Sequence, residues 1–343
     1  MTKRTSKPNR FGAVMLALAA LGSPQAVAAA QQGEAHLWAA DPPAAFIAPP
    51  LDPTGVTLAT RELAPGVYAL LSGAAAVDNS GFVVGERDVL VIDAHINGAM
   101  ARQIQAAVAR VTDKPIRYLV NTNYHGDHTF GNYAFPAETT IIAHRETAAR
   151  MVDFEAETAL MLRTVNNNPA IFAENRPRLP DLTFDQRLKI DLGGRVVEVH
   201  HFGPGNTPGD TVVYVPEAKV AWTGNLVLGE GTIPPIFEGG PGAYLETIAR
   251  FRRTLPVATI IPGHGAPTTG AILGRYLTYL SGLMETVRAA AGAGLSEDQS
   301  VADLVLDDAY LPPADSPFAA LAPFLSGLHA LNVQLAYREL NGK

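Results

Sequence analysis

Two histidines and an aspartate lie within four residues of one another, at His125, Asp127 and His128. The apolar run directly before this stretch, IRYLV (Ile116–Val120), has the composition of a buried strand, so the cluster is expected on a loop that leaves a strand end. Two imidazoles and a carboxylate at this spacing can converge on one small cation. The pattern alone also fits a loop that is anchored by hydrogen bonds, so other segments must decide between the two.

The sequence contains no cysteine. This excludes disulfides, thiolate metal ligands and a cysteine nucleophile, so any metal must be held by nitrogen and oxygen atoms. Of the 343 residues, 47% are hydrophobic, which suffices for the core of one large domain or of two small ones.

Residues 1–28 have the organisation of a secretory signal peptide. Four basic residues precede the apolar run 11–22, which is too short to span a bilayer comfortably, and Ala26–Ala28 offers a cleavage site. An uncleaved membrane anchor is the alternative. Cleavage would remove four positive charges and no acids, so the formal charge would go from −7 to −11. We therefore predict a periplasmic or secreted protein with no stable membrane insertion after cleavage. Its acidity makes it a poor candidate for binding nucleic acid.

The remaining chain divides into three predicted parts. Residues 29–54 are expected to form an extended N-terminal arm, because their prolines forbid a continuous helix. In residues 55–270, two blocks of short strand candidates are each followed by helical patterns, such as the amphipathic stretch Gly98–Val111. This order suits an α/β sandwich of two sheets with helices on both outer faces. Residues 271–343 are predicted to form a helical C-terminal extension, which with the arm could serve a homodimer.

Three more polar loops follow strand-like segments. The first is HFGPGNTPGDT (residues 201–211), and the second is TGN (Thr223–Asn225). The third is PGHG, in which the glycines on both sides of His264 let another part of the backbone approach closely. With the NYHGDH loop, they make four polar loops that leave strand ends.

In order and chemistry, these four loops resemble the metal-binding motifs of the metallo-β-lactamase superfamily. Members of that family share an αββα sandwich with a metal site along one edge, and their motifs are HxHxDH, GHTPGD, TGD and PGHG. The resemblance covers residues 55–270 and rests on four separated motifs in the same order.

The sequence departs from the family pattern at three positions. Asn123 stands where the first His of HxHxDH is expected, and Asn206 stands where the His of GHTPGD is expected. By the resemblance, these two residues and His125 belong to one three-His metal site, which therefore lacks two imidazoles. The third departure is Asn225, which replaces the Asp of TGD.

The other metal site of the family is complete in this sequence. The resemblance assigns Asp127, His128 and His264 to it, and two imidazoles with one carboxylate are a known catalytic zinc set. We expect one Zn²⁺ per chain, with the Asn225 side-chain oxygen as a fourth or near contact. Replacing a bridging Asp by Asn also removes one negative charge, which favours a metal-bound hydroxide at neutral pH. The alternative is a decayed, metal-free relative.

The single-metal pattern resembles one branch of the superfamily in particular, the hydrolytic chlorothalonil dehalogenases. It implies a hydroxide that attacks an electrophilic carbon of a small-molecule substrate, with Asp127 in both the catalytic and the metal-binding set. We predict that His125 shuttles a proton or bonds the substrate, and that Asn123 and Asn206 donate hydrogen bonds nearby. Two alternatives remain open: a lactone, ester or β-lactam hydrolase, and a metal-poor binding protein without turnover.

Overall fold

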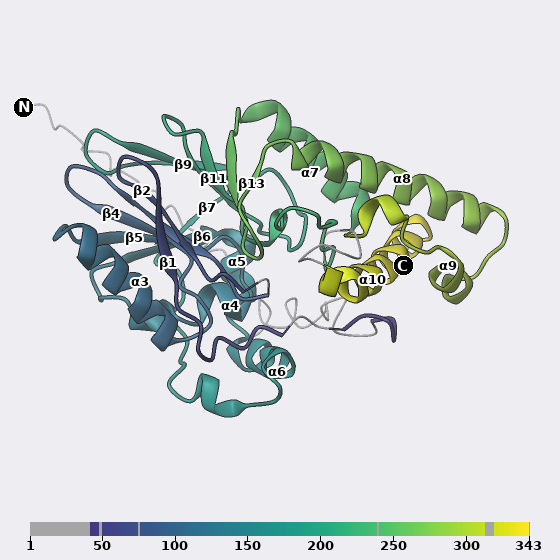
Figure 1. Cartoon of the computed structure of the whole chain (residues 1–343), viewed down its shortest axis with the longest axis horizontal. Coiled ribbons are helices and arrows are strands. Elements are labelled where there is room, and N and C mark those ends of the chain that lie inside the picture. Colours follow the sequence, from purple (N-terminus) through teal and green to yellow (C-terminus); the bar gives the residue numbers. More distant parts are fainter. Residues whose placement is uncertain (1–41, 48–49, 75, 239, 313–318, 343) are drawn as a thin grey trace, which may run out of the picture. The chain divides into compact units, whose positions relative to one another are not determined.

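Two β-sheets form the centre of the fold (Figure 1). The structure is a computed structural model that describes residues 42–47, 50–74, 76–238, 240–312 and 319–342. The predicted signal peptide (residues 1–28) lies outside these residues, as does most of the predicted arm (residues 29–54).

Within the described residues, the first sheet has seven strands and the second has six. The first contains, in spatial order, β1 (Ala59–Ala64), β2 (Val67–Leu71), β3 (Ser80–Val84), β4 (Val89–Ile92), β5 (Ile116–Val120), β6 (Thr140–His144) and β7 (Leu182–Phe184). The second contains, in spatial order, β13 (Thr268–Thr269), β12 (Thr259–Ile261), β11 (Val220–Trp222), β10 (Val212–Val215), β9 (Val196–His200) and β8 (Arg187–Asp191). The strands β4 to β7 run parallel, and so do β11 and β12.

The two sheets bury side chains against each other because apolar residues occupy both faces of their central strands. In β4, Leu90 and Ile92 belong to one apolar cluster while Val89 and Val91 belong to another. Successive side chains of a strand point to opposite faces, so the first pair lies between the sheets. Trp222 of β11 joins this inner cluster from the second sheet and is 2% exposed.

Helices cover the outer faces, as the two strand-then-helix blocks predict. The described helices are α3 (Gly98–Val111), α4 (Gly126–Thr129), α5 (Arg145–Arg150), α6 (Phe154–Thr164), α7 (Pro241–Thr254), α8 (Ile272–Gly292), α9 (Glu297–Asp303) and α10 (Ala322–Leu340). The apolar stripe of α3, which includes Met100 and Ile104, is buried in the outer cluster with Val91. The predicted helix Gly98–Val111 is therefore confirmed, and so is the predicted α/β sandwich.

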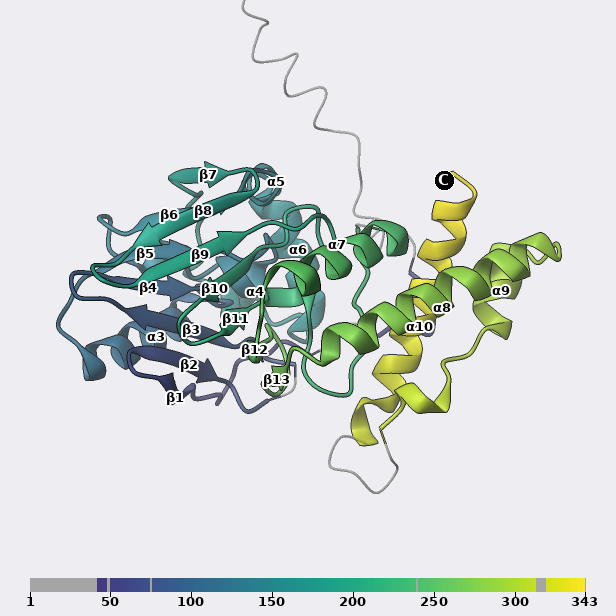
Figure 2. The same ribbon diagram turned by 90° about the horizontal axis from the view of Figure 1, so that it is seen from above.

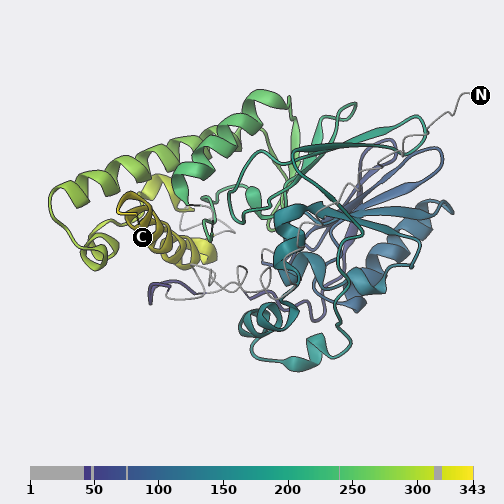
Figure 3. The same ribbon diagram turned by 180° about the vertical axis from the view of Figure 1, so that it is seen from behind.

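The C-terminal helices pack on α7 and on one another. Figure 2 shows α8, α9 and α10 grouped beyond one end of the sheets. In Figure 3, which views the molecule from behind, α8 lies above α10. Asn332 of α10 donates a hydrogen bond to the Pro234 carbonyl, and the Tyr276 hydroxyl of α8 accepts one from the Leu228 amide. The helices therefore hold the loop that follows β11.

The segment Ala319–Leu340 is long and apolar enough to cross a membrane, by length and composition alone. In this structure, 56% of its most apolar window is buried against the rest of the protein. Such burial is typical of a core helix in a water-soluble domain.

Candidate metal centre

Four strand ends bring the candidate site residues to one edge of the sandwich. Asp93 follows β4, and the NYHGDH loop follows the parallel strand β5. Asn225 follows β11, and His264 follows the parallel strand β12. Because the carboxyl ends of parallel strands lie at the same edge of a sheet, both sheets deliver polar loops to one place.

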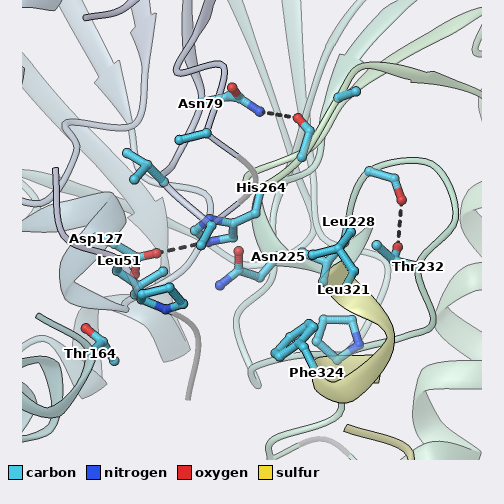
Figure 4. A pocket seen from close by; sticks show the side chains of 18 of the residues that line it. Leu51, Asn79, Asp127, Thr164, Asn225, Leu228, Thr232, His264, Leu321 and Phe324 are labelled. Atoms are coloured by element: carbon cyan, nitrogen blue, oxygen red, sulfur yellow. Dashed lines mark hydrogen bonds and ion pairs between the residues drawn. The ribbon is translucent and has the colours of Figure 1, made fainter. Parts of the chain in front are cut away.

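Asp127, His128, Asn225 and His264 converge there, and we call these four residues the donor cluster. Figure 4 shows three of them, Asp127, Asn225 and His264. Asp127 Oδ2 lies 3.0 Å from His264 Nε2 and 3.6 Å from His128 Nε2. His128 Nε2 lies 3.1 Å from Asn225 Oδ1. The structure thus places all four residues assigned to the metal by sequence around a common centre.

The spacing of these atoms fits a small tetrahedral cation. Zinc binds nitrogen and oxygen ligands at about 2.0–2.1 Å, so neighbouring tetrahedral ligands lie about 3.3 Å apart. The distances of 3.0, 3.1 and 3.6 Å within the donor cluster bracket that value. Asp127 and His128 are buried, and the cluster offers two imidazoles, a carboxylate and an amide oxygen. This donor set therefore fits one Zn²⁺ ion.

His128 is held in one orientation by an acid behind it. Its Nδ1 donates a 2.9 Å hydrogen bond to Asp93 Oδ2, which leaves Nε2 directed at the donor cluster. Asp93 is itself fixed, since it accepts hydrogen bonds from the backbone amide and the hydroxyl of Thr122, each at 2.7 Å. Carboxylates that hold a metal-binding imidazole from behind fix its tautomer and raise its basicity.

The charges at the donor cluster are arranged for a cation. Burial lowers the pKa of His128, but three neighbouring carboxylates raise it by more, so the net pKa lies well above its ordinary value. Burial raises the pKa of Asp127, whereas the imidazoles of His128 and His264 lower it by more, so its net pKa lies below the usual range. The cluster therefore stabilises positive charge, whether a proton or a metal ion provides it.

The loop that carries His264 is fastened by Asn79. The Asn79 amide group donates hydrogen bonds to the carbonyls of Pro262 at 3.1 Å and of Gly265 at 2.9 Å. Its backbone amide donates to the Gly263 carbonyl at 2.6 Å. Asn79 lies directly before β3 and is buried, so one residue of the first sheet fixes the metal loop of the second.

Gly263 confirms the close approach expected of the PGHG loop. A Cβ atom at this position would lie 2.8 Å from Asn225 Oδ1 and 2.9 Å from His128 Cε1. Real Cβ atoms do not approach so closely, and both neighbours belong to the donor cluster. A side chain here would therefore push the donor cluster apart.

Two positions of the family's other metal site hold neutral amide side chains, Asn123 and Asn206, in place of histidines. Asn123 Oδ1 accepts a hydrogen bond from the His125 amide, and its Nδ2 has no partner among the described residues. Asn206 Nδ2 donates to the Pro235 carbonyl at 2.9 Å, which leaves Oδ1 buried without a partner among those residues. Both side chains are fully buried.

His125 forms a buried pair with Glu157 of α6. Its Nδ1 lies 3.4 Å from Glu157 Oε1, and this oxygen also accepts a hydrogen bond from the Gly126 amide at 2.8 Å. Burial lowers the pKa of His125, but Glu157 and other nearby acids raise it by more, so the net pKa lies above its ordinary value. His125 can thus hold a proton beside the donor cluster.

The donor cluster opens into a cavity of about 850 Å³ (Figure 4). Asp127, Asn225 and His264 line it, as do the predicted catalytic residues His125 and Asn206, whereas Asn123 does not. Most of the wall is apolar and comes from four segments: Phe46–Leu51 without the undescribed residues 48–49, Leu71–Asn79 without residue 75, Leu228–Phe237, and Ala320–Phe324.

Two acids near the donor cluster were missed by the sequence analysis. The Asp78 carboxylate lies within 4.8 Å of ligand atoms of both His128 and His264, so these three residues form a further candidate metal group. Glu157 faces His125 from α6. Glu157 lies on a helix, and Asp78 lies in the loop between β2 and β3, which carries none of the four motifs. The position of Asp78 two residues before the buried strand SGFVV is the one sequence signal that could have indicated it.

Comparison with known proteins places the chain in a family. The profile described as the metallo-beta-lactamase superfamily matches residues 76–264, which is more than half of the chain. A linear primary-alkylsulfatase of Pseudomonas sp. (strain ATCC 19151) is 21% identical over an alignment 215 residues long, which covers 53% of this chain and 40% of that protein. The chain therefore spans about two fifths of the length of this curated relative.

Solved structures share the fold at low sequence identity. A metallo-beta-lactamase from Pontibacter korlensis matches with a TM-score of 0.51 at 20% identity, over 66% of this chain and 99% of that one. A stereoselective inverting sec-alkylsulfatase from Pseudomonas sp. matches with a TM-score of 0.64 at 15% identity, over 82% of this chain and 50% of that one. At these identities the likeness concerns the fold alone.

Proposed function

Because the chain belongs to the metallo-beta-lactamase superfamily of hydrolases, we propose that it is a hydrolase that binds one zinc ion in the donor cluster. The observation that carries this proposal is the asymmetry of the site, in which the donor cluster is complete while Asn123 and Asn206 occupy the neighbouring positions. An amide oxygen is a weak zinc ligand beside an imidazole or a carboxylate. When bound, the zinc ion acts as a Lewis acid and lowers the pKa of a coordinated water to about 7.

The cavity favours a neutral, apolar substrate. Apolar side chains such as Leu51, Phe237 and Phe324 make up most of its wall, and no Lys or Arg is present among the described lining residues. A sulfate ester would therefore find no permanently charged cationic side chain along this wall. This supports hydrolytic dehalogenation of an electron-poor chlorinated aromatic, of which chlorothalonil is an example, over hydrolysis of an alkyl sulfate.

The residues of the site suit such a displacement. The oxygen of water bonds to the ring carbon, the carbon–chlorine bond breaks, and chloride leaves with the bonding electron pair. Chloride needs no proton, whereas the nitrogen leaving group of an amide or β-lactam must be protonated. We assign to His125 the proton released by the water, because Glu157 Oε1, 3.4 Å from His125 Nδ1, stabilises the protonated imidazole.

Two measurements and a control variant test this proposal. Zinc titration of metal-stripped protein should reach a plateau near one zinc per chain, since the donor cluster supplies one ligand set. The zinc-loaded protein is then incubated separately with a chlorinated aromatic nitrile, a lactone, a β-lactam and a primary alkyl sulfate. We expect release of chloride from the nitrile, and only in the presence of zinc. His264→Ala serves as the metal-deficient control.

The other outcomes identify the alternatives. Release of acid without chloride would assign the protein to lactone, ester or β-lactam hydrolysis, and release of sulfate would contradict the argument from the cavity wall. Strongly substoichiometric zinc after supplementation would favour a binding protein without turnover. A well-occupied centre with two zinc ions per chain would refute the one-metal assignment.

We also propose that the protein is exported to the periplasm or secreted, and that the arm and the C-terminal helices can serve a homodimer. The basic and apolar segments of residues 1–28 support export. Expression of the full chain in a Gram-negative host is expected to yield protein in the periplasmic fraction that begins at residue 29. N-terminal sequencing checks this result, and an intact N-terminus in the cytoplasmic fraction would contradict it.

A further inference from the structure

Asp78 is an acid that the proposed reaction does not use. It lies in the loop between β2 and β3, and its side chain is 1% exposed. Neither carboxylate oxygen accepts a hydrogen bond of normal geometry from the described residues. A buried carboxylate without such bonds loses its hydration without replacement, so it destabilises the fold unless a nearby positive charge compensates it.

The loop fixes Asp78 in place from both sides. Its backbone carbonyl accepts a hydrogen bond from His95 Nε2 at 3.1 Å, and the adjacent Asn79 is bonded to the carbonyls of Pro262 and Gly265. The carboxylate therefore has little freedom to move out to solvent. The contacts of Asn79 that fasten the His264 loop therefore also hold Asp78 in place.

The positive charge nearest to Asp78 belongs to the donor cluster. Asp78 Oδ2 lies 3.5 Å from His128 Nδ1, on the side of the ring away from the common centre. That nitrogen already donates its hydrogen to Asp93 Oδ2 at 2.9 Å. Asp78 thus adds a second acid behind the same imidazole without sharing its hydrogen bond.

We infer that Asp78 is a positioning residue that raises the affinity of the donor cluster for a divalent cation by adding a negative charge behind His128. This inference rests on the proposed metal site. It accounts for a carboxylate that is buried without a hydrogen bond among the described residues, since the cation adds positive charge nearby. It also explains how a cluster with Asn225 in place of an acid retains sufficient attraction for the metal.

The charge can act at this range because the site is buried. The Asp78 carboxylate lies within 4.8 Å of ligand atoms of both His128 and His264. Charges a few ångströms apart interact strongly where water does not screen them. Loss of an acid that supports a metal-binding imidazole typically weakens metal affinity about 10- to 100-fold.

The test compares zinc affinity and stability in the full chain, without any substrate. Chelator competition should show that Asp78→Asn weakens zinc binding about 10- to 100-fold at unchanged stoichiometry. Asp52→Asn is the matched control, since Asp52 lines the same cavity and its carboxylate accepts a bond from the nearby Thr54 amide. It should change zinc affinity less than about threefold, as expected of a partly exposed carboxylate.

Thermal unfolding separates this role from a structural one. In the metal-free protein, Asp78→Asn should not lower the melting temperature, because the desolvation of the buried carboxylate offsets its attraction to His128. The rise in melting temperature on adding zinc should then be smaller than in the unsubstituted protein. A merely structural Asp78 would instead lower stability both with and without zinc, and that result would overturn the inference.

Each remaining outcome also decides whether Asp78 has the inferred positioning role. Zinc affinity of Asp78→Asn within about threefold of the unsubstituted protein would overturn the inference, given the loss expected of such a partner. Complete loss of stoichiometric zinc would identify Asp78 as a direct ligand and would overturn the positioning role. An unsubstituted protein that binds no zinc would refute the proposed metal site itself, which distinguishes the two failures.

Discussion

Replacing His128 or His264 by alanine is expected to abolish zinc retention. Each residue supplies one of the two imidazole nitrogens of the donor cluster, so either variant would retain only one imidazole, one carboxylate and one amide oxygen. The loss of affinity should exceed the roughly 100-fold upper range for groups that only support a ligand. Metal analysis after gel filtration, with chelator competition, measures the effect.

Asn123→Ala and Asn206→Ala are the matched controls for this prediction. Both residues are buried near the donor cluster, but neither belongs to it. Most of the zinc should therefore remain in both variants. Equal loss of zinc from His264→Ala and Asn123→Ala would contradict the one-site assignment. The metal-free melting temperature of each variant shows whether it is folded.

Gly263→Ala is expected to weaken zinc binding without removing any ligand. The new Cβ would lie 2.8 Å from Asn225 Oδ1 and 2.9 Å from His128 Cε1, so these groups must move apart. Such overpacking costs about 1–3 kcal/mol of stability. A displacement of about 1 Å at a functional site can cost about 100-fold in function, and we expect zinc affinity to fall by that order.

Gly282→Ala tests whether the effect is specific to the site. Gly282 lies in α8 and is exposed, and an added Cβ meets no atom within 4 Å. The same substitution there should leave zinc affinity unchanged and should stabilise the protein by about 0.5–1 kcal/mol, because it removes a glycine from a helix. Unfolding by urea measures the change. An unaltered zinc affinity in Gly263→Ala would refute the close approach of the two metal loops.

The sequence was sufficient to predict the two-sheet sandwich and the convergence of the four donor-cluster residues. The strand IRYLV became β5 at its predicted residues, and the predicted helix Gly98–Val111 became α3. His128 and Asn225 meet although they are far apart in the chain, because each lies on a segment that leaves the end of a strand. Strand ends are local patterns, and local patterns can be read without coordinates.

The acids that surround the donor cluster could not be predicted in the same way. Glu157 lies on the buried side of α6, where its register against the NYHGDH loop depends on how that helix packs. Asp78 depends on a loop that is fixed by contacts to Pro262 and Gly265. Such contacts join residues that are distant in the chain and follow no periodic pattern.

In this cavity, the residues that determine substrate selectivity are separate from the residues that form the reactive centre. Its floor is built from strand ends, whereas Phe46, Leu51 and Phe324 in its wall come from segments outside both sheets. Mutations in those peripheral segments can change which molecules are accepted while the reactive centre stays intact. Related proteins with this layout can therefore change their substrate range while they keep the same reaction. A library randomised at these wall positions offers a direct route to altered selectivity.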